Sequence, residues 1–196
     1  MRLIENCTAV LLTGGESRRM GADKAMAEIH GKPMAAHIIE AIDPLFSDLL
    51  ISVREFRTDV TLPQIVDSSS GRGPMIGIKS ALEAVQTDWL FVIACDMPFV
   101  STDLIHALAL KREHHDAVLT HVSDRPQPLF GFYAKSCLPQ MQVRIAEGQR
   151  SMMRLLDQLD VCLMAEAEVK AIDPQLNSLM SLDSVEEIKK MELNNE

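Results

Sequence analysis

Short apolar runs alternate with segments of helical period along this chain, and this alternation constrains the fold more than any other feature. Five runs read as strands buried on both faces, at residues 7–13, 49–53, 89–95, 117–122 and 129–134. Between them lie apolar stripes at helical spacing: Met34, Ile38, Ile42 and Leu45; Ile78, Leu82 and Val85; Leu104, Ile105 and Leu108. This succession predicts an α/β fold with a mostly parallel sheet and helices on both faces. Ligands of such sheets bind at the carboxyl ends of the strands.

Size and charge narrow the class of protein. The 196 residues, 47% apolar and 24% charged, predict one domain, 1–196. A net charge of −9 argues against nucleic acid or an anionic membrane as the main partner, so a bound anion needs a local cationic cluster. No signal peptide or membrane-spanning run is evident, and we expect a cytoplasmic protein. The four cysteines form no CxxC pair and are expected to be reduced.

The segment LLTGGESRRMGADKA, residues 11–25, places glycines and cationic side chains directly after the first predicted strand. Gly14 and Gly15 can turn the chain sharply and bring main-chain N–H groups against an anion. Arg18, Arg19 and Lys24 add positive charge. The segment matches neither GxxxxGK[ST] nor GxGxxG, and the alternative is a glycine turn flanked by solvated arginines. We interpret it as a phosphate-binding loop.

A second polar position follows the most apolar run, in FVIACDMPFV. Asp96 has no packing role at the end of such a strand, but its carboxylate could hold a divalent cation, for which Mg²⁺ is the natural candidate. The alternative is a turn cap before Pro98. A metal carboxylate beside a cationic phosphate loop is what nucleotidyl transfer needs, because both neutralise a triphosphate under attack.

Five segments resemble the molybdenum cofactor guanylyltransferases, and together they span most of the chain: LLTGGESRRMGADKA, HGKPM, VDSSSGRGPMIGI, VIACDMPFVSTDL and RPQPLFGFYAKSCLP. The resemblance implies a Rossmann-like nucleotidyltransferase fold. It implies transfer of GMP from GTP to the phosphate of molybdenum-bound molybdopterin, with pyrophosphate as the second product. GTP, molybdopterin and Mg²⁺ would be the small-molecule partners, and cofactor-synthesis proteins or molybdoenzyme chaperones would be further partners.

The same resemblance implies roles for individual residues. Its substrate-binding set comprises Leu12, Thr13, Gly14, Gly15, Arg19, Lys24, Ser52, Asp67 and Asp96. Lys24 matches a phosphate-contacting lysine and Asp96 the magnesium ligand, so these two are the expected catalytic residues. Asp67 matches a nucleotide-contacting aspartate. The acceptor phosphate is a dianion near neutral pH and needs no general base.

Two further segments match the family, and two positions depart from it. Gly73, Pro74 and Gly77 fit a GPxxG segment, while Gln127, Pro128, Leu129 and Arg150 resemble the acceptor side. Ser52 stands where some members carry asparagine. The family pattern Asn-x-Asn-Thr-Pro-Glu reads Ser-Leu-Asp-Ser-Val-Glu at residues 181–186, where Ser184 and Glu187 form a capping box for a last helix. Contacts to the acceptor or the ribose are therefore expected to differ.

Base choice is predicted from Gly14. Guanylyltransferases of this kind read Leu-Ala-Gly-Gly at the strand end and the related cytidylyltransferases read Leu-Ala-Ala-Gly, whereas this chain reads Leu-Thr-Gly-Gly. The glycine places the chain with the guanine users. The alternatives are a molybdopterin cytidylyltransferase, a sugar-phosphate nucleotidyltransferase, or a non-catalytic nucleotide sensor or cofactor carrier.

Overall fold

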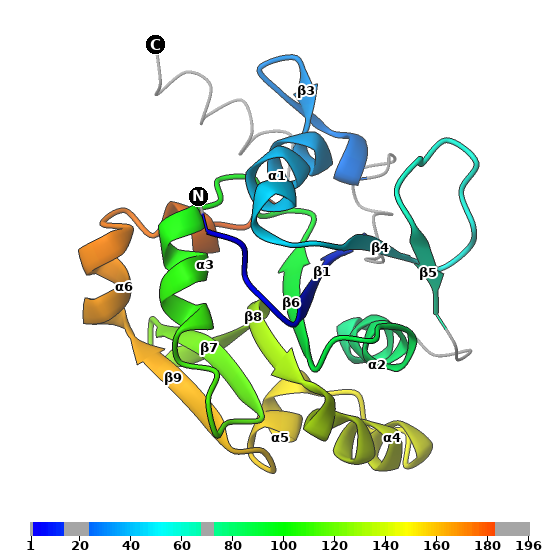
Figure 1. The fold of residues 1–196 in the computed structure, drawn as a ribbon, viewed down its shortest axis with the longest axis vertical. Coiled ribbons are helices and arrows are strands. Elements are labelled where there is room, and N and C mark those ends of the chain that lie inside the picture. The colour runs from blue at the N-terminus through cyan, green and yellow to red at the C-terminus, as the bar shows by residue number, and fades with distance from the viewer. Residues whose placement is uncertain (1, 14–23, 68–72, 183–196) are drawn as a thin grey trace.

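A seven-stranded sheet forms the centre of the molecule, and the computed structural model describes residues 2–13, 24–67 and 73–182 (Figure 1). The strands stand in the order β5-β4-β1-β6-β8-β7-β9. Their bounds are β1 Cys7–Leu12, β4 Leu49–Val53, β5 Gln64–Val66, β6 Trp89–Ala94, β7 Ala117–Val122, β8 Arg125–Ala134 and β9 Val161–Ala165. A separate hairpin pairs β2 (Glu28–Ile29) with β3 (Lys32–Pro33). All five predicted strands are present.

The sheet is mostly parallel, as the sequence predicts. The pairs β1–β4, β1–β6, β4–β5 and β7–β9 are parallel, whereas β8 runs antiparallel to both β6 and β7. In the register of the central strands, Leu12 of β1 lies opposite Ser52 of β4 and Ala94 of β6. The residues that follow these three positions therefore emerge at one edge of the sheet.

The chain departs from parallel pairing between β7 and β8. These strands form a hairpin through Ser123 and Asp124, whose φ angles are 53° and 59°. Two consecutive left-handed residues match the tight turns that join antiparallel strands, and a link of two residues is too short for a crossover. As a result β8 begins at the edge where the parallel strands end.

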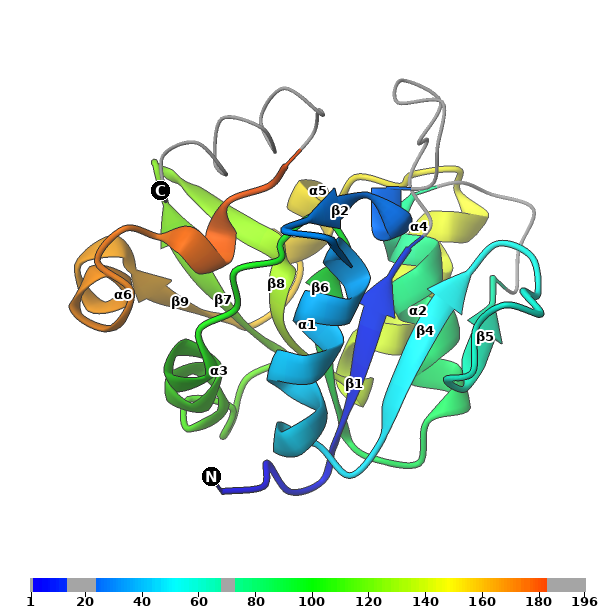
Figure 2. The same cartoon turned by 90° about the horizontal axis from the view of Figure 1, so that it is seen from above.

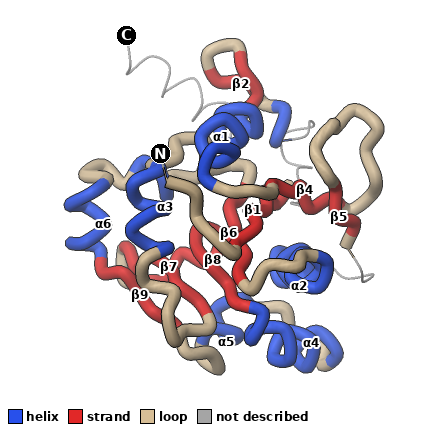
Figure 3. Tube along the Cα trace, viewed as in Figure 1, coloured by secondary structure: helices blue, strands red, loops and turns tan. Residues whose placement is uncertain are grey.

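Within the described residues, six α-helices cover the two faces of the sheet (Figure 3). One face carries α1 (Met34–Ile42), α3 (Thr102–Ala109) and α6 (Glu166–Ile172), whose buried side chains join one apolar cluster with β1, β4 and β6. The other face carries α2 (Pro74–Ala84), α4 (Leu138–Ala146) and α5 (Met152–Leu156), which share a second cluster. The three predicted stripes are buried, as Ile38, Leu82 and Leu104 illustrate with no exposed surface. The helices on both faces are thus confirmed.

Burial also accounts for the cysteines. Cys7, Cys95 and Cys137 are buried, and none of the four cysteines forms a disulfide. Desolvation raises the pKa of the Cys7 thiol to about 12, and it does the same for Cys137. These thiols are packing groups rather than nucleophiles. Among the described helices, none is long and apolar enough to cross a membrane, and the predicted last helix falls outside the described residues.

The strand order places a topological switch beside β1. From β1 the chain proceeds to β4 and β5 on one side, and then crosses to β6 on the other side of β1. In open α/β sheets the crevice for a ligand opens at the carboxyl ends of the strands that flank such a switch. Figure 2 shows the tips of β1 and β4 at one common edge. Of the predicted site residues that the structure describes, Leu12, Thr13, Ser52, Asp67 and Asp96 lie at or just after the ends of these strands.

Candidate active site

The end of β1 is tied to both neighbouring strands. The main-chain N–H of Thr13 donates to the Ser52 carbonyl at 3.2 Å, and the Thr13 hydroxyl donates to the same oxygen at 2.8 Å. On the other side, the Cys95 N–H donates to the Leu12 carbonyl at 3.1 Å. The strand end that was predicted to lie against the nucleotide is therefore rigidly placed between β4 and β6.

The phosphate loop itself follows this strand end. Gly14, Gly15 and Arg19 lie outside the described residues, so their predicted contacts stay predictions. Lys24 begins a short 3-10 helix, η2 (Lys24–Met26), which leads into the β2–β3 hairpin. The described chain thus resumes at the residue that was predicted to stabilise the reacting phosphate.

The first of two carboxylate sites, termed here the Asp67 corner, consists of Leu12, Ser52, Asp67 and Gly77. The Ser52 hydroxyl donates to Asp67 Oδ1 at 3.4 Å, and the Asp67 N–H donates to the Val53 carbonyl at 3.0 Å. A Cβ atom at position 77 would lie 2.7 Å from Ser52 Oγ and 3.3 Å from Leu12 Cδ2. Only glycine lets α2 approach the sheet this closely.

Electrostatics distinguish this carboxylate. Partial burial raises the pKa of Asp67 above its ordinary value, and the hydrogen bond from Ser52 and the charge of Arg54 offset part of that rise. A carboxylate that is partly stripped of water and aimed at the edge of the sheet is suited to accept hydrogen bonds from a ligand. This fits the predicted contact with the nucleotide.

The second site, termed the Asp96 corner, follows β6. Asp96 is partly buried in a turn in which the Met97 N–H donates to the Ala94 carbonyl. The Asp96 carbonyl accepts a hydrogen bond of 2.9 Å from the N–H of Leu182, near the C-terminal end of the described chain. The main chain of the predicted metal ligand is therefore held by a segment that no local sequence pattern links to it.

The donor set fits a magnesium ion whose remaining ligands come from a nucleotide. No group of three or more His, Cys, Asp or Glu side chains suited to a metal occurs in the described part of the chain. Asp67 and Asp96 follow strands separated by β4 and β1, so three strand spacings, about 14 Å, lie between them. Mg²⁺ commonly uses one or two carboxylates together with phosphate oxygens and water. One protein carboxylate, from Asp96, is consistent with that mode of binding.

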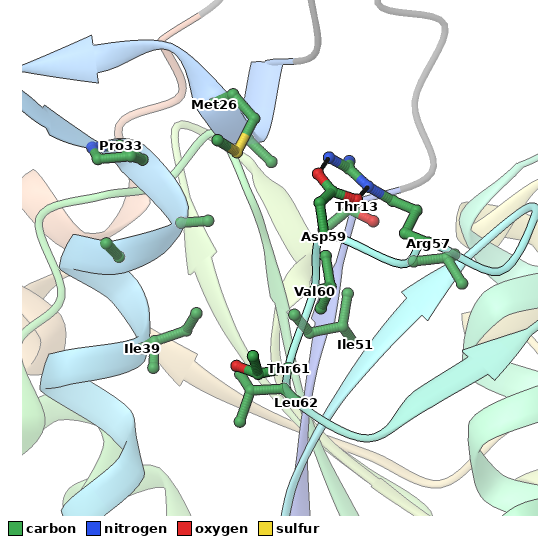
Figure 4. Close-up of a pocket in the computed structure, with 14 residues that line it drawn as sticks. Thr13, Met26, Pro33, Ile39, Ile51, Arg57, Asp59, Val60, Thr61 and Leu62 are labelled. Atoms are coloured by element: carbon green, nitrogen blue, oxygen red, sulfur yellow. Dashed lines mark hydrogen bonds and ion pairs between the residues drawn. The ribbon is translucent and has the colours of Figure 1, made fainter.

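A cavity of about 220 Å³ lies on the α1 side of β4, with Thr13 from the end of β1 among its lining residues (Figure 4). Ile51 and Val53 line it, and because side chains alternate along a strand, the Ser52 side chain between them faces the other way. Most of the wall is apolar, and the Arg57–Asp59 ion pair of 2.7 Å lies among the lining residues. The cavity is thus separate from the Asp67 corner and differs from it in chemistry.

The predicted acceptor-side residues begin β8, at the same edge. The Gln127 amide donates to the Val122 carbonyl at 3.5 Å, and the Tyr133 hydroxyl donates to the Pro128 carbonyl at 2.7 Å. Arg150 is exposed in the loop between α4 and α5. The hairpin that makes β8 antiparallel is what brings Gln127 to this edge.

Together these features define a class: an α/β nucleotidyltransferase fold with two carboxylates at the carboxyl edge of its sheet. Residues 9–162 match the family model described as the MobA-like NTP transferase domain, which covers well over half of the chain. The chain belongs to this family.

Individual relatives agree with that membership. The chain is 30% identical to a probable molybdenum cofactor guanylyltransferase of Methanosarcina acetivorans, over 94% of this chain and 89% of the relative. It is 32% identical to a molybdenum cofactor guanylyltransferase of Vibrio campbellii, over 74% of this chain and 77% of the relative.

Solved structures share the fold. The crystal structure of molybdopterin-guanine dinucleotide biosynthesis protein A from Archaeoglobus fulgidus matches with a TM-score of 0.84 and 24% identity, covering 100% of this chain and 98% of that one. A 2-C-methyl-D-erythritol 4-phosphate cytidylyltransferase from Thermus thermophilus matches with a TM-score of 0.67 and 14% identity, covering 95% of this chain and 97% of that one. These likenesses establish a Rossmann-like nucleotidyltransferase fold.

Proposed function

We propose that this chain transfers GMP from GTP to the phosphate of molybdenum-bound molybdopterin, forming the guanine dinucleotide cofactor and pyrophosphate. The observation that carries the proposal is the common edge at which β1, the Asp67 corner and the Asp96 corner meet, in a chain of the MobA-like family. The names of the relatives, molybdenum cofactor guanylyltransferases, support guanine as the base and the molybdenum cofactor precursor as the acceptor.

In the proposed reaction, an oxygen of the acceptor phosphate attacks the α-phosphorus of GTP, and the bond between the α-phosphorus and the α,β-bridging oxygen breaks, so that pyrophosphate leaves. The acceptor oxygen is already deprotonated in a phosphate dianion, so no protein base has to remove a proton. Lys24 offsets the negative charge that accumulates on the α-phosphoryl oxygens. Asp67 accepts a hydrogen bond from the nucleotide at its partly buried carboxylate.

Asp96 is the proposed anchor for Mg²⁺. When bound there, the ion would neutralise triphosphate oxygens and favour departure of pyrophosphate. Thr13 and Leu12 place the start of the phosphate loop between the two corners, and Gly14, Gly15 and Arg19 are the proposed loop contacts. A cytoplasmic location and further protein partners in cofactor synthesis or delivery remain part of this proposal.

The test is release of pyrophosphate with each of the four nucleoside triphosphates and molybdenum-loaded molybdopterin, with identification of the dinucleotide by mass. Of the four nucleotides, we expect only GTP to give pyrophosphate release and the pterin dinucleotide. Efficient product formation with CTP would favour a cytidylyltransferase. GTP binding without pyrophosphate release in the presence of the pterin would favour a nucleotide sensor or cofactor carrier.

A further inference from the structure

The loop that follows β6 is held at both of its ends by one distant segment. At its first residue, the Asp96 carbonyl accepts the N–H of Leu182 at 2.9 Å. At its last, the Ser101 N–H donates to the Ser178 hydroxyl at 2.9 Å, a contact between residues 77 positions apart. Residues 173–182, termed the strap, thus bracket residues 96–101, which carry the proposed metal ligand.

The strap has a fixed conformation at its first end. The buried Asp173 carboxylate accepts main-chain N–H groups from Asn177 at 3.1 Å and from Ser178 at 2.8 Å. Leu176 takes a left-handed conformation with φ of 56°, which turns the chain into the 3-10 helix η5 (Asn177–Leu179). Ser178 is fully buried. Its hydroxyl is therefore presented to Ser101 by a carboxylate-capped turn rather than by a free surface loop.

The other end of the strap is anchored by packing. The Leu182 side chain is 2% exposed and shares an apolar cluster with Ile29 of β2 and Met34 of α1. Phe99, from the bracketed loop, packs against the same cluster. Figure 2 shows the strap running from α6 to the neighbourhood of β2. The strap therefore touches both the Asp96 loop and the hairpin that follows Lys24 and η2.

We propose that the strap positions Asp96 for the nucleotide-bound Mg²⁺, with Ser178 and Leu182 as the positioning residues. Fixing the carbonyl of Asp96 fixes the direction of its Cα–Cβ bond, and with it the region that the carboxylate can reach. Mg²⁺ demands near-octahedral geometry and tolerates displaced ligands poorly. Groups that orient a metal ligand affect metal affinity although they never touch the metal. The role of Mg²⁺ in this inference rests on the proposed function, whereas the contacts of Ser178 and Leu182 do not.

Ser178→Ala tests the strap because it deletes the acceptor for the Ser101 N–H and leaves every predicted substrate contact in place. Without the hydroxyl, we expect the Mg²⁺ concentration for half-maximal activity to rise about three- to tenfold, the range that corresponds to one lost hydrogen bond. Activity at saturating Mg²⁺ should return to near the wild-type value. A purely structural serine would lower the thermal midpoint and leave the metal dependence unchanged.

Thr87→Ala is the matched control. Thr87 has a partly buried hydroxyl that donates to the Trp89 carbonyl at 3.0 Å, near the amino end of β6 and at the opposite edge of the sheet. It should lower the thermal midpoint by an amount similar to Ser178→Ala and leave the Mg²⁺ dependence unaltered. Equal metal dependence in the two variants would overturn the proposal.

A direct binding measurement tests the role of the strap in metal binding without depending on the transfer reaction. Mn²⁺ is titrated into wild type and Ser178→Ala in the presence of a non-hydrolysable GTP analogue, without the pterin, while hydrogen exchange reports on the Leu182 and Ser101 amides. We expect weaker Mn²⁺ binding and faster exchange at both amides in the variant. If wild type forms no dinucleotide yet the variant binds Mn²⁺ more weakly, the proposed function fails and the strap stands. If wild type is active and Mn²⁺ binding is equal in both proteins, the strap proposal fails.

Asp173→Asn provides the same test from within the strap. It keeps one carbonyl acceptor but removes the charge that holds the N–H groups of Asn177 and Ser178. We expect a smaller increase in the Mn²⁺ dissociation constant than for Ser178→Ala, in the same direction. Should Ser178→Ala fail to fold, an unchanged Mn²⁺ affinity in folded Asp173→Asn would overturn the proposal.

Discussion

The two corners of the candidate site differ in the contacts that hold their aspartates. Asp67 is held by close neighbours on adjacent elements, through the hydroxyl of Ser52 and the absence of a side chain at Gly77. Asp96 is held through its main chain, by Leu182 in a segment near the other end of the chain. The first arrangement adjusts the hydration of a carboxylate, and the second adjusts its position. The difference suits a group that accepts hydrogen bonds and a group that anchors a metal, respectively.

The largest expected effect is the loss of Lys24, the cation that we expect to act between the two corners. If both corners serve one reaction, its removal should abolish most activity and leave the structure of each corner unchanged. Lys24 follows the loop after β1, the strand that lies between β4 and β6. We expect Lys24→Ala to lower kcat about 10²-fold or more, because the charge on the reacting phosphate loses its partner.

Lys111→Ala is the control for the lysine, because it removes a lysine from a surface ion pair with Glu168 at 2.9 Å. Turnover of this variant should match wild type. The measurement is steady-state kinetics with GTP together with the thermal midpoint. Near-normal turnover of Lys24→Ala at wild-type stability would contradict the claim that the two corners share a phosphate site that depends on Lys24.

The metal side of the comparison is tested by Asp96→Asn, which keeps the size of the side chain and removes its charge. We expect turnover to fall about 10- to 100-fold at low Mg²⁺, with partial recovery at higher Mg²⁺. Asp88→Asn is the control from the opposite end of the same strand, where Asp88 accepts a hydrogen bond from Asn6. A wild-type Mg²⁺ dependence in Asp96→Asn would remove Asp96 as a ligand.

The nucleotide side is tested by Gly77→Ala. The added methyl group would lie 2.7 Å from Ser52 Oγ, so that hydroxyl must rotate away from Asp67. We expect the KM for GTP to rise about three- to tenfold, the scale of one lost hydrogen bond, with kcat nearly unchanged. Isothermal titration with GTP and steady-state kinetics measure this split.

A double variant makes the Gly77 test specific. In Ser52→Ala/Gly77→Ala the hydroxyl that the methyl group would displace is gone, so the pair should bind GTP no more weakly than Ser52→Ala alone. Such non-additivity is expected for side chains in direct contact. If the losses of GTP affinity in the two single variants added up in the double variant, the effect of Gly77→Ala would not pass through Ser52.

The smallest expected effect is on stability. Burial raises the pKa of Asp67, so the fold favours its protonated form, and stability falls as pH rises through that raised pKa. At neutral pH, Asp67→Asn should therefore raise the thermal midpoint by about 1–2 °C while weakening GTP binding. The gain should vanish as pH falls below 3.8, the ordinary value for the group.

Asp59→Asn is the control of opposite sign for this pH dependence. A hydrogen bond from Arg57 lowers the pKa of Asp59, so its contribution to stability is present at neutral pH and is lost on acidification. Thermal midpoints across the pH range measure both variants. A stabilising Asp59→Asn, or a destabilising Asp67→Asn at neutral pH, would contradict these signs.

Local patterns predicted the interior of the fold well. The apolar runs gave β1, β4 and β6 because these strands are buried on both faces, and the helical stripes gave α1, α2 and α3. The strands β5 and β9 were missed because edge strands are short and partly exposed, and so lack a continuous apolar run. The β7–β8 hairpin was missed because Ser123 and Asp124 adopt left-handed angles without a glycine to signal the turn.

The candidate site divides in the same way. Asp96 follows a strongly apolar run, so the sequence pattern could indicate it, whereas Asp67 and Gly77 were indicated by the resemblance to the family. Nothing local indicates that Leu182 bonds to Asp96 or that Ser178 bonds to Ser101, because these contacts arise only when distant segments pack.

Base choice is the central claim, and it depends on Gly14. We expect the absence of a Cβ at this position to give guanine room against the loop, which an added methyl group would take up. Gly14→Ala should therefore lower kcat/KM for GTP, by about 10-fold or more, without creating an efficient CTP enzyme.

The most direct measurement is a single-turnover reaction of the wild-type protein with molybdenum-loaded molybdopterin and equal amounts of GTP and CTP. Each nucleotide carries a different, distinguishable label at its α-phosphate. We predict that the label of GTP appears in the pterin dinucleotide and that unlabelled pyrophosphate is released in equal amount. Label from CTP in the product, or no transfer from either nucleotide, would contradict the assignment of this chain as a guanylyl-transferring enzyme.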